Sequence, residues 1–238
     1  MIFDLQFAPI LEHAPALLDA FWLTVKLSIG AVILGCLLGL LATTARSMQP
    51  RYFKWVVDLY VEAIRNTPLL VQLYIIFFAL PEFGVRMPAV YAGLLALTIN
   101  LGAYSTEIFR AGIESIHRSQ IEAGMSLSLT RWQVFVHIVL KPAVAKVWPS
   151  LVSQIILTML GSSICSFISV QELSGEAYTI QSLTYRSFEI YIVASIMYLA
   201  FALFLKAMLT GLGHYLFTPR RRRHAVSAGR VAQKGVQS

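Results

Sequence analysis

Long apolar runs separated by short polar stretches dominate the pattern of this 238-residue chain. The run from Leu27 to Ala45 carries no charge and, with the six residues before it, is long enough to cross a bilayer. Similar runs recur along the chain and predict five membrane-spanning helices, at about 21–45, 56–80, 88–110, 147–170 and 190–217. The expected fold class is therefore an all-α polytopic membrane protein whose membrane domain covers residues 1–219.

The second predicted span differs from the others because its first half is charged. Asp58, Glu62 and Arg65 fall on one helical face, whereas residues 69–80 are uncharged, which predicts a partly exposed helix that enters the membrane. Pro68 should bend this helix, since proline lacks a backbone N–H and restricts the residue before it, here Thr67. A short turn is expected over residues 81–88, and a short helix over about 172–183.

Small residues mark places where helices are expected to pack closely. Gly35 and Gly39 are four residues apart in the first span and should let another helix approach. The only cysteines, Cys36 and Cys165, each lie inside an apolar run, so we expect them to pack as small hydrophobic residues without a disulfide.

A polar stretch of a different kind, residues 120–135, lies between the third and fourth spans. Its apolar residues recur at helical spacing and predict one short amphipathic helix, the apolar positions being Ile121, Met125, Leu127, Leu129 and Trp132. Such a helix belongs at a surface or in the groove of a partner. The loop that contains it is expected to run from about residue 114 to 143.

Composition supports a membrane protein, with 57% hydrophobic and 13% charged residues and a mean hydropathy of +0.69. The net charge of +7 is unevenly placed, because the five spans put most basic residues on one side. These residues are Arg46, Arg51, Lys54, Arg118, Arg131, Lys141, Lys146 and Arg220 to Arg223. That side is predicted to be cytoplasmic, with a periplasmic N-terminus and a cytoplasmic C-terminus. The basic tail, 220–238, shows no apolar periodicity and is expected to be disordered.

Polar residues inside the spans are the candidates for chemistry. Asn100 lies near the middle of the third span, and Ser150, Gln154, Thr158 and Ser162 form a stripe with a spacing of four in the fourth. Such a stripe either lines a polar pathway or holds helices together. Glu107 and Arg110 are expected to form a pair within one helix. The histidines have no metal-ligand spacing, so no metal site is predicted.

The polar stretch between the spans carries a resemblance to a known family. Glu122, Ala123, Ile138 and Leu140 resemble the loop motif of permease subunits of binding-protein-dependent ABC importers: Glu-Ala-Ala, a glycine, then Ile-x-Leu-Pro. Gly124 stands for the second alanine, Ser128 for the glycine, and Lys141-Pro142 for Pro-Gln. The segments Arg65–Leu73 and Ala103–Gly112 are similar to those of the polar amino-acid branch, whose members carry histidine, glutamine, arginine or opines. The resemblance extends from about Thr24 to Phe217.

This resemblance implies a type I ABC importer fold in the bacterial inner membrane. It implies a pair of permease subunits, identical or homologous, around a central pathway, with ATP-binding cassette subunits on one side and a periplasmic solute-binding protein on the other. The residues implied to couple the loop to the ATPase are Glu122, Ala123, Gly124, Leu127, Ser128 and Trp132. Those that match the branch signature are Arg65, Thr67, Pro68 and Gln72.

The chain itself is not expected to be an enzyme. It has no Gly-x-x-x-x-Gly-Lys-Ser/Thr loop, so ATP and magnesium are expected on a separate subunit, and this chain is expected to bind no cofactor. The alternatives are a polytopic membrane enzyme, for which no catalytic motif or catalytic residue is found, and a channel without ATP coupling.

An amino-acid substrate has a carboxylate that seeks donors and an ammonium group that seeks acceptors. Asn100, Gln154, Thr158 and Ser162 would supply both kinds of group without a net charge, which makes them the predicted substrate pathway. The alternative reading, that these side chains only join helices, stays open. Ser128 is expected to continue the loop helix, where the family's glycine would allow a sharp bend.

Overall fold

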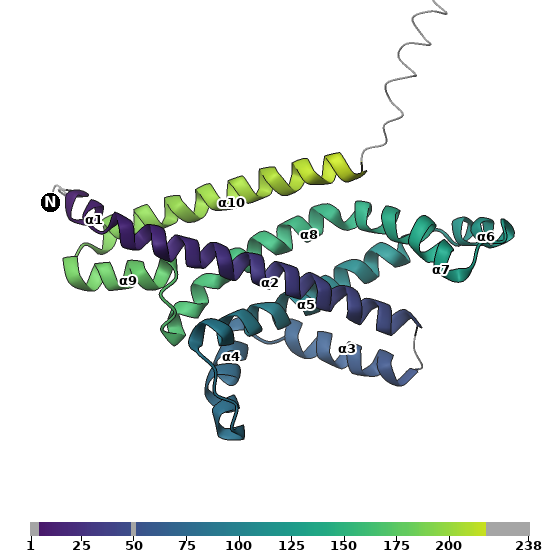
Figure 1. The fold of residues 1–238 in the computed structure, drawn as a ribbon, viewed down its shortest axis with the longest axis horizontal. Coiled ribbons are helices and arrows are strands. Elements are labelled where there is room, and N and C mark those ends of the chain that lie inside the picture. Colours follow the sequence, from purple (N-terminus) through teal and green to yellow (C-terminus); the bar gives the residue numbers. More distant parts are fainter. Residues whose placement is uncertain (1–4, 49–50, 218–238) are drawn as a thin grey trace, which may run out of the picture.

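The computed structural model describes residues 5–48 and 51–217, and these are folded as a chain of helices joined by short turns (Figure 1). The α-helices are α1 (Ala8–Leu11), α2 (Ala14–Met48), α3 (Arg51–Arg65), α4 (Leu69–Tyr74), α5 (Ala89–Glu114), α6 (Arg118–Ser126), α7 (Arg131–Gln133), α8 (Lys141–Gly161), α9 (Leu173–Thr184) and α10 (Ser187–Phe217). Two π-helical segments, η1 (Ile75–Ala79) and η3 (Val134–Leu140), and two 3-10 segments, η2 (Leu80–Phe83) and η4 (Ser162–Ile168), extend them.

The helical stretches that are long and apolar enough to cross a membrane overlap the predicted spans, although the fourth begins at Arg131, inside the predicted loop. Among the described residues these are Ala14–Arg46, Ala89–Glu114, Arg131–Ile168 and Ser187–Phe217, and the bent pair Tyr52–Arg65 and Leu69–Phe83 makes a fifth if counted as one span. The all-α polytopic prediction is therefore confirmed. The predicted disordered tail, 220–238, lies outside the described residues.

The bend predicted at Pro68 is confirmed, because α3 and α4 meet at 108°. Pro68 has extended backbone angles, φ −65° and ψ 138°, and caps the start of α4. The amide of Gln72 then reaches back and donates to the carbonyls of Ile64, at 2.8 Å, and Thr67, at 3.0 Å. Since a broken helix leaves its last carbonyls without partners, the Gln72 side chain stabilises the bend that Pro68 creates.

The close helix approach predicted at Gly35 and Gly39 is also confirmed, and it joins α2 to α5. A Cβ at Gly39 would lie 2.5 Å from Ser105 Cβ, and one at Gly35 would lie 2.8 Å from Leu101 Cβ. No larger residue fits at either position unless the two helices move apart. Both cysteines are free, as predicted: Cys165 is buried in the core that α2, α4 and α5 share, and Cys36 is half-buried.

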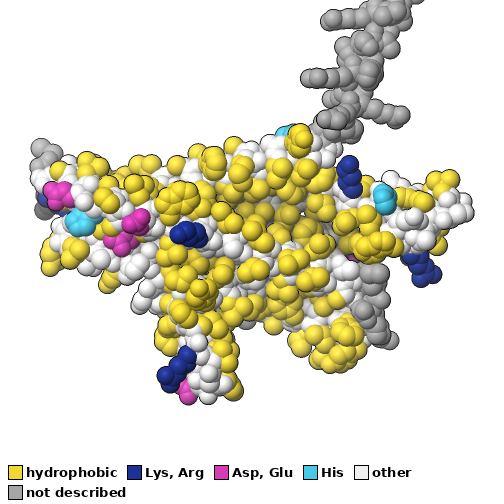
Figure 2. Space-filling model, viewed as in Figure 1, with side chains coloured by type: hydrophobic (Ala, Val, Ile, Leu, Met, Phe, Trp, Pro, Cys, Tyr) yellow, Lys and Arg dark blue, Asp and Glu magenta, His cyan; other side chains and the backbone are white. Residues whose placement is uncertain are grey.

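The molecule is elongated, with α6 and α7 at one end and α1 and α9 at the other (Figure 1). We call these the loop end and the α9 end. Hydrophobic side chains cover most of the face shown in Figure 2, including many on the outer sides of α2 and α10. A surface of this kind is suited to lipid rather than to water.

Candidate functional site

The loop at the loop end begins with α6, whose start is capped by His117. The imidazole Nδ1 of His117 accepts the amide N–H of Ser119 at 3.3 Å. The helix stops at Leu127, and after a turn Thr130 and Gln133 form a reciprocal capping box that starts α7. From α7 the chain passes without a break through η3 into α8. The loop therefore connects directly to two membrane helices, α5 before it and α8 after it.

The prediction of one continuous helix over 120–135, with Ser128 inside it, is wrong. Ser128 has φ 60°, the left-handed conformation that glycine favours. Its N–H donates to the carbonyl of Met125, and the N–H of Leu129 donates to that of Gly124, which together form a Schellman motif. Serine thus occupies the helix-ending position for which the family's glycine is suited, and the bend is kept.

Gly124 sets how closely α6 lies on η3. It is buried, and a Cβ at this position would collide with Ile138 Cδ1. Because this buried side of α6 faces η3, other apolar side chains of the loop point outward. Met125, Leu127 and Trp132 are 47%, 75% and 59% exposed.

The exposed acidic and small residues at the start of α6 lie beside these apolar side chains. We call the group Glu122, Ala123, Met125, Leu127 and Trp132 the loop surface. The Glu122 carboxylate makes no hydrogen bond or ion pair with any residue that the structure describes. Five of the six predicted coupling residues are therefore exposed on one short loop, whereas Gly124 supports them from beneath.

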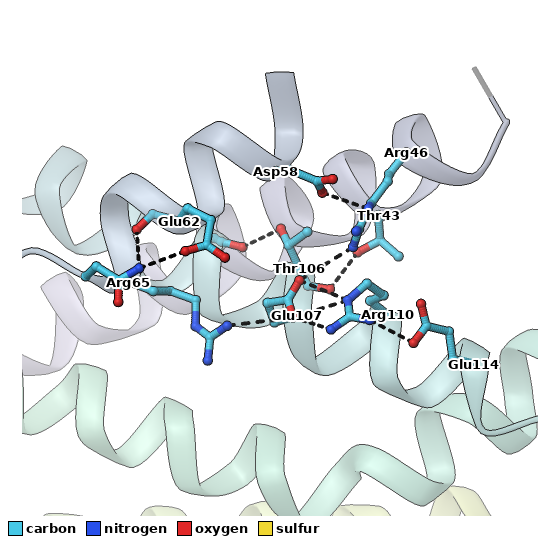
Figure 3. A network of polar contacts seen from close by, with 11 residues as sticks. Thr43, Arg46, Asp58, Glu62, Arg65, Thr106, Glu107, Arg110 and Glu114 are labelled. Carbon is cyan, nitrogen blue, oxygen red and sulfur yellow. Dashed lines mark hydrogen bonds and ion pairs between the residues drawn. The ribbon is translucent and has the colours of Figure 1, made fainter. Parts of the chain in front are cut away.

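An ion-pair cluster lies just before this loop, where α2, α3 and α5 meet (Figure 3). The Glu107 carboxylate binds Arg110 at 2.6 Å, which confirms the predicted pair within α5. Arg46 of α2 and Arg65 of α3 also approach it, at 3.6 and 3.7 Å. Arg46 pairs in addition with Asp58 at 2.8 Å. The cluster therefore ties three helices together, which the sequence alone did not indicate.

The signature residues form the bend between α3 and α4. Thr67 donates its hydroxyl to the carbonyl of Ala63 at 2.8 Å and accepts the Gln72 amide at 2.9 Å. Asn100 of α5 in turn donates to the Gln72 side-chain oxygen at 3.0 Å. Arg65 lies over the ring of Tyr104, 5.4 Å from its centroid. Asn100 is thus brought to the signature residues, and its role in a substrate pathway stays a prediction.

The polar stripe of α8 is partly enclosed by neighbouring helices. Thr158 is 6% exposed and Ser162 is fully buried. Their hydroxyls donate to carbonyls of their own helix, those of Gln154 and Met159. Gln154 is half-buried, and Ser150 is exposed. Within the described chain no hydrogen bond joins this stripe to Asn100. Helix packing accounts for the positions of Thr158 and Ser162. The assignment of Asn100, Gln154, Thr158 and Ser162 to a substrate pathway stays a prediction.

A buried carboxylate at the α9 end was not among the predicted site residues. Glu172 is fully buried and caps the start of α9, where the amides of Ser174 and Gly175 donate to it at 2.9 and 3.0 Å. The hydroxyls of Thr24 and Tyr198 donate to its other oxygen at 3.4 and 2.6 Å. Burial raises the pKa of the Glu172 carboxyl group. The carboxyl group therefore loses its proton at a higher pH in the folded protein than in the unfolded chain. Glu is not among the residues that favour an N-cap, and its partners on α2 and α10 are far away in the sequence, so no local signal marked this site.

Comparison with known proteins identifies the family. The family described as "Binding-protein-dependent transport system inner membrane component" matches residues 31–217. A probable amino-acid ABC transporter permease protein of Sinorhizobium fredii is 32% identical over 76% of this chain and 78% of its own length. The L-cystine transport system permease protein TcyB of Bacillus subtilis is 37% identical over 70% of this chain and 71% of its own.

Solved structures agree with the sequence relatives. A chain from the crystal structure of an amino acid ABC transporter with histidines is 34% identical, with a TM-score of 0.83 over 90% of this chain and all of that chain. The MetNI methionine ABC transporter in an inward facing conformation shares the fold, with a TM-score of 0.67 at 14% identity. The loop between membrane helices, its exposed apolar surface and these similarities agree: the chain belongs to the inner-membrane components of binding-protein-dependent transport systems, the permease subunits of ABC importers.

Proposed function

We propose that this chain forms one half of the translocation pathway of an ATP-driven importer that carries a polar amino acid across the bacterial inner membrane. Its partners are a second permease subunit, cytoplasmic ATP-binding cassette subunits and a periplasmic solute-binding protein. In this arrangement the loop end faces the cytoplasm, in agreement with the excess of basic residues there, and the N-terminus faces the periplasm.

The loop surface is the observation that carries this proposal. Leu127 and Trp132 expose most of their side chains on a polar loop outside the apolar body of the helices. Exposed apolar groups beside a polar rim are typical of protein interfaces, and tryptophan is prominent among residues that dominate binding energy. A groove on an ATP-binding subunit would cover this surface.

The internal packing of the loop would transmit motion from such a partner. The Schellman motif and the capping box fix the angle between α6 and α7, and Gly124 holds α6 against η3. Because η3 continues into α8 and α6 follows α5, a displacement of the loop moves both membrane helices. Packed elements with discrete arrangements transmit such displacements as rigid bodies.

ATP and magnesium belong to the partner ATPase in this proposal, and the chain itself carries out no catalysis. No group of His, Cys, Asp or Glu that could hold a metal ion occurs in the part of the chain that the structure describes. The substrate class follows from the relatives, which are named for transport of cystine, arginine and glutamine.

Two loop variants of the assembled importer test the coupling role. Leu127→Asp and Trp132→Ala should each lower ATP-dependent amino-acid uptake and binding-protein-stimulated ATP hydrolysis about thirtyfold, because a hot-spot side chain contributes roughly 2 kcal/mol or more. Both rates are measured in proteoliposomes. Phe83→Ala is the matched control, since Phe83 is 82% exposed on η2, outside the loop, and should leave both rates unchanged.

Full uptake by the two loop variants would contradict coupling through this surface. Uptake that continues without ATP and without a binding protein would instead favour a channel. Conversion of the amino acid to another compound would favour a membrane enzyme.

A further inference from the structure

A column of serines follows the polar stripe of α8, where the helix type changes. The segment η4 is a 3-10 helix, and side chains three residues apart lie above one another in this geometry. Ser163 and Ser166 therefore line up, and Ser169, with φ 65°, ends the segment on the same side. A spacing of four residues, typical of an α-helix, would instead continue the polar stripe through Ser162, which is buried.

The serine column lines a cavity of about 720 Å³, which we call the serine cavity. The cavity is also lined by Gln171, just before α9, by Tyr178 of α9, and by Tyr191 in the first turns of α10. The cavity is at the α9 end, where η4 leads into α9 (Figure 1), and is therefore on the side of the membrane from which the proposed importer receives its substrate.

The hydrogen-bonding groups of the cavity are of two kinds. The hydroxyls of Ser163 and Ser166 donate to the carbonyls of Leu160 and Ser163, at 2.8 and 2.7 Å, so each keeps an oxygen that can accept. In contrast, the Gln171 Nε2 and the phenol groups of Tyr178 and Tyr191 have no hydrogen-bond partner among the described residues. The lining therefore offers both hydroxyl oxygens that can accept and exposed donors that no described residue occupies.

Among the residues that the structure describes, no charged side chain lines the serine cavity. The carboxylate nearest in sequence, Glu172, is fully buried and already binds four neutral donors, two backbone amides and two hydroxyls. A ligand with a charged side chain would find no counter-ion here, and an unpaired charge removed from water is costly.

We propose that the serine cavity binds the amino acid on its way through the permease and selects zwitterions whose side chains are uncharged. The donors of Gln171, Tyr178 and Tyr191 bind the carboxylate, and the serine oxygens accept from the ammonium group. This inference rests on the proposed function and narrows its substrate class.

Binding to the purified permease complex, without the binding protein, tests the selection directly. The complex is dialysed against an equimolar mixture of the twenty standard amino acids, and the retained amino acids are quantified by mass spectrometry. The wild type should retain mainly amino acids with uncharged side chains. Loss of two donors in the double variant Gln171→Ala, Tyr191→Phe should lower this retention about tenfold.

Gln171→Glu sharpens the test because it changes charge with little change of shape. It should lower retention of uncharged amino acids about tenfold and raise that of lysine and arginine. Gln181→Glu is the matched control, because it makes the same change in α9 at a residue that does not line the cavity, and it should behave as the wild type.

The proposal is overturned if the wild type retains no amino acid or mainly charged ones, or if the double variant and Gln171→Glu retain the same amino acids as the wild type. ATP-dependent uptake is measured on the same preparations. If uptake remains while the cavity variants have no effect on retention, the serine cavity is excluded and the importer function stands. If uptake does not depend on ATP, the importer function itself fails.

Discussion

Glu107 and Glu172 each join three helices, but their surroundings differ in kind. Glu107 of α5 meets arginines from α2, α3 and its own helix, and its side chain is 21% exposed. Glu172 before α9 meets hydroxyls from α2 and α10 and two amides of α9, and it is fully buried. The long helix α2 takes part in both groups, with Arg46 at one end and Thr24 at the other.

This difference follows from the cost of removing charges from water. Close to an aqueous interface, arginines and a carboxylate keep part of their hydration and can pair at modest cost. In the interior, bringing a cation to Glu172 would add a second desolvation penalty, whereas neutral donors satisfy the carboxylate without one. Among the described residues, Glu172 therefore joins α2, α9 and α10 through neutral donors alone, whereas the ion pair of Arg186 with Glu189 at this end involves no residue that lines the serine cavity.

The largest effect is expected from Glu172→Ala. The variant leaves the start of α9 without its cap and removes the carboxylate to which Tyr198 donates, so that among the described residues the Tyr198 hydroxyl keeps only Ser174 Oγ at 3.0 Å. Each buried group left unsatisfied costs roughly 1–3 kcal/mol. We expect a clear loss of stability, measured as a lower thermal unfolding midpoint in detergent. Glu176→Ala, one turn into α9, is the control and should have little effect. An unchanged midpoint for Glu172→Ala would show that the buried contacts of Glu172 do not stabilise the α9 end, and the contrast with Glu107 would fail.

A smaller effect is expected from Glu107→Gln. Loss of the carboxylate charge leaves three arginines facing one another, which should lower stability by about 1–2 kcal/mol. Added salt should reduce this loss, because half-exposed charges are screened, while the loss caused by Glu172→Ala should not depend on salt. Unfolding midpoints at low and high salt measure both. Equal salt dependence of the two variants would show that the two ends do not differ as described.

The smallest effect is expected from Asp58→Asn. Asp58 pairs with Arg46 at 2.8 Å, but its side chain is 36% exposed, and pairs of this kind contribute about 0–1 kcal/mol. Its unfolding midpoint should lie within a degree or two of the wild type, on the order of what such a pair contributes. A loss as large as that of Glu107→Gln would place the centre of the cluster on Arg46 rather than on Glu107.

Features that depend on residues close together in the sequence were predictable from it. The apolar runs predicted the membrane helices, Pro68 predicted the bend, and Gly35 with Gly39 predicted a close helix approach. The break at Ser128 was not predicted, because serine does not favour the left-handed conformation that it adopts there. The capping box of Thr130 and Gln133 beyond it was the available signal for a second helix start.

The sequence by itself determined which stretches are long and apolar enough to cross a membrane and which loop carries the family motif, since both depend on local runs and short spacings. Only the tertiary structure decided which partners the two glutamates have: Thr24 is 148 residues from Glu172, and Arg46 comes from a different helix than Glu107. It also decided that the serines after α8 follow a spacing of three. The segment η4 packs against α5, and contacts between segments so far apart in the chain are not encoded in the local spacing of residues.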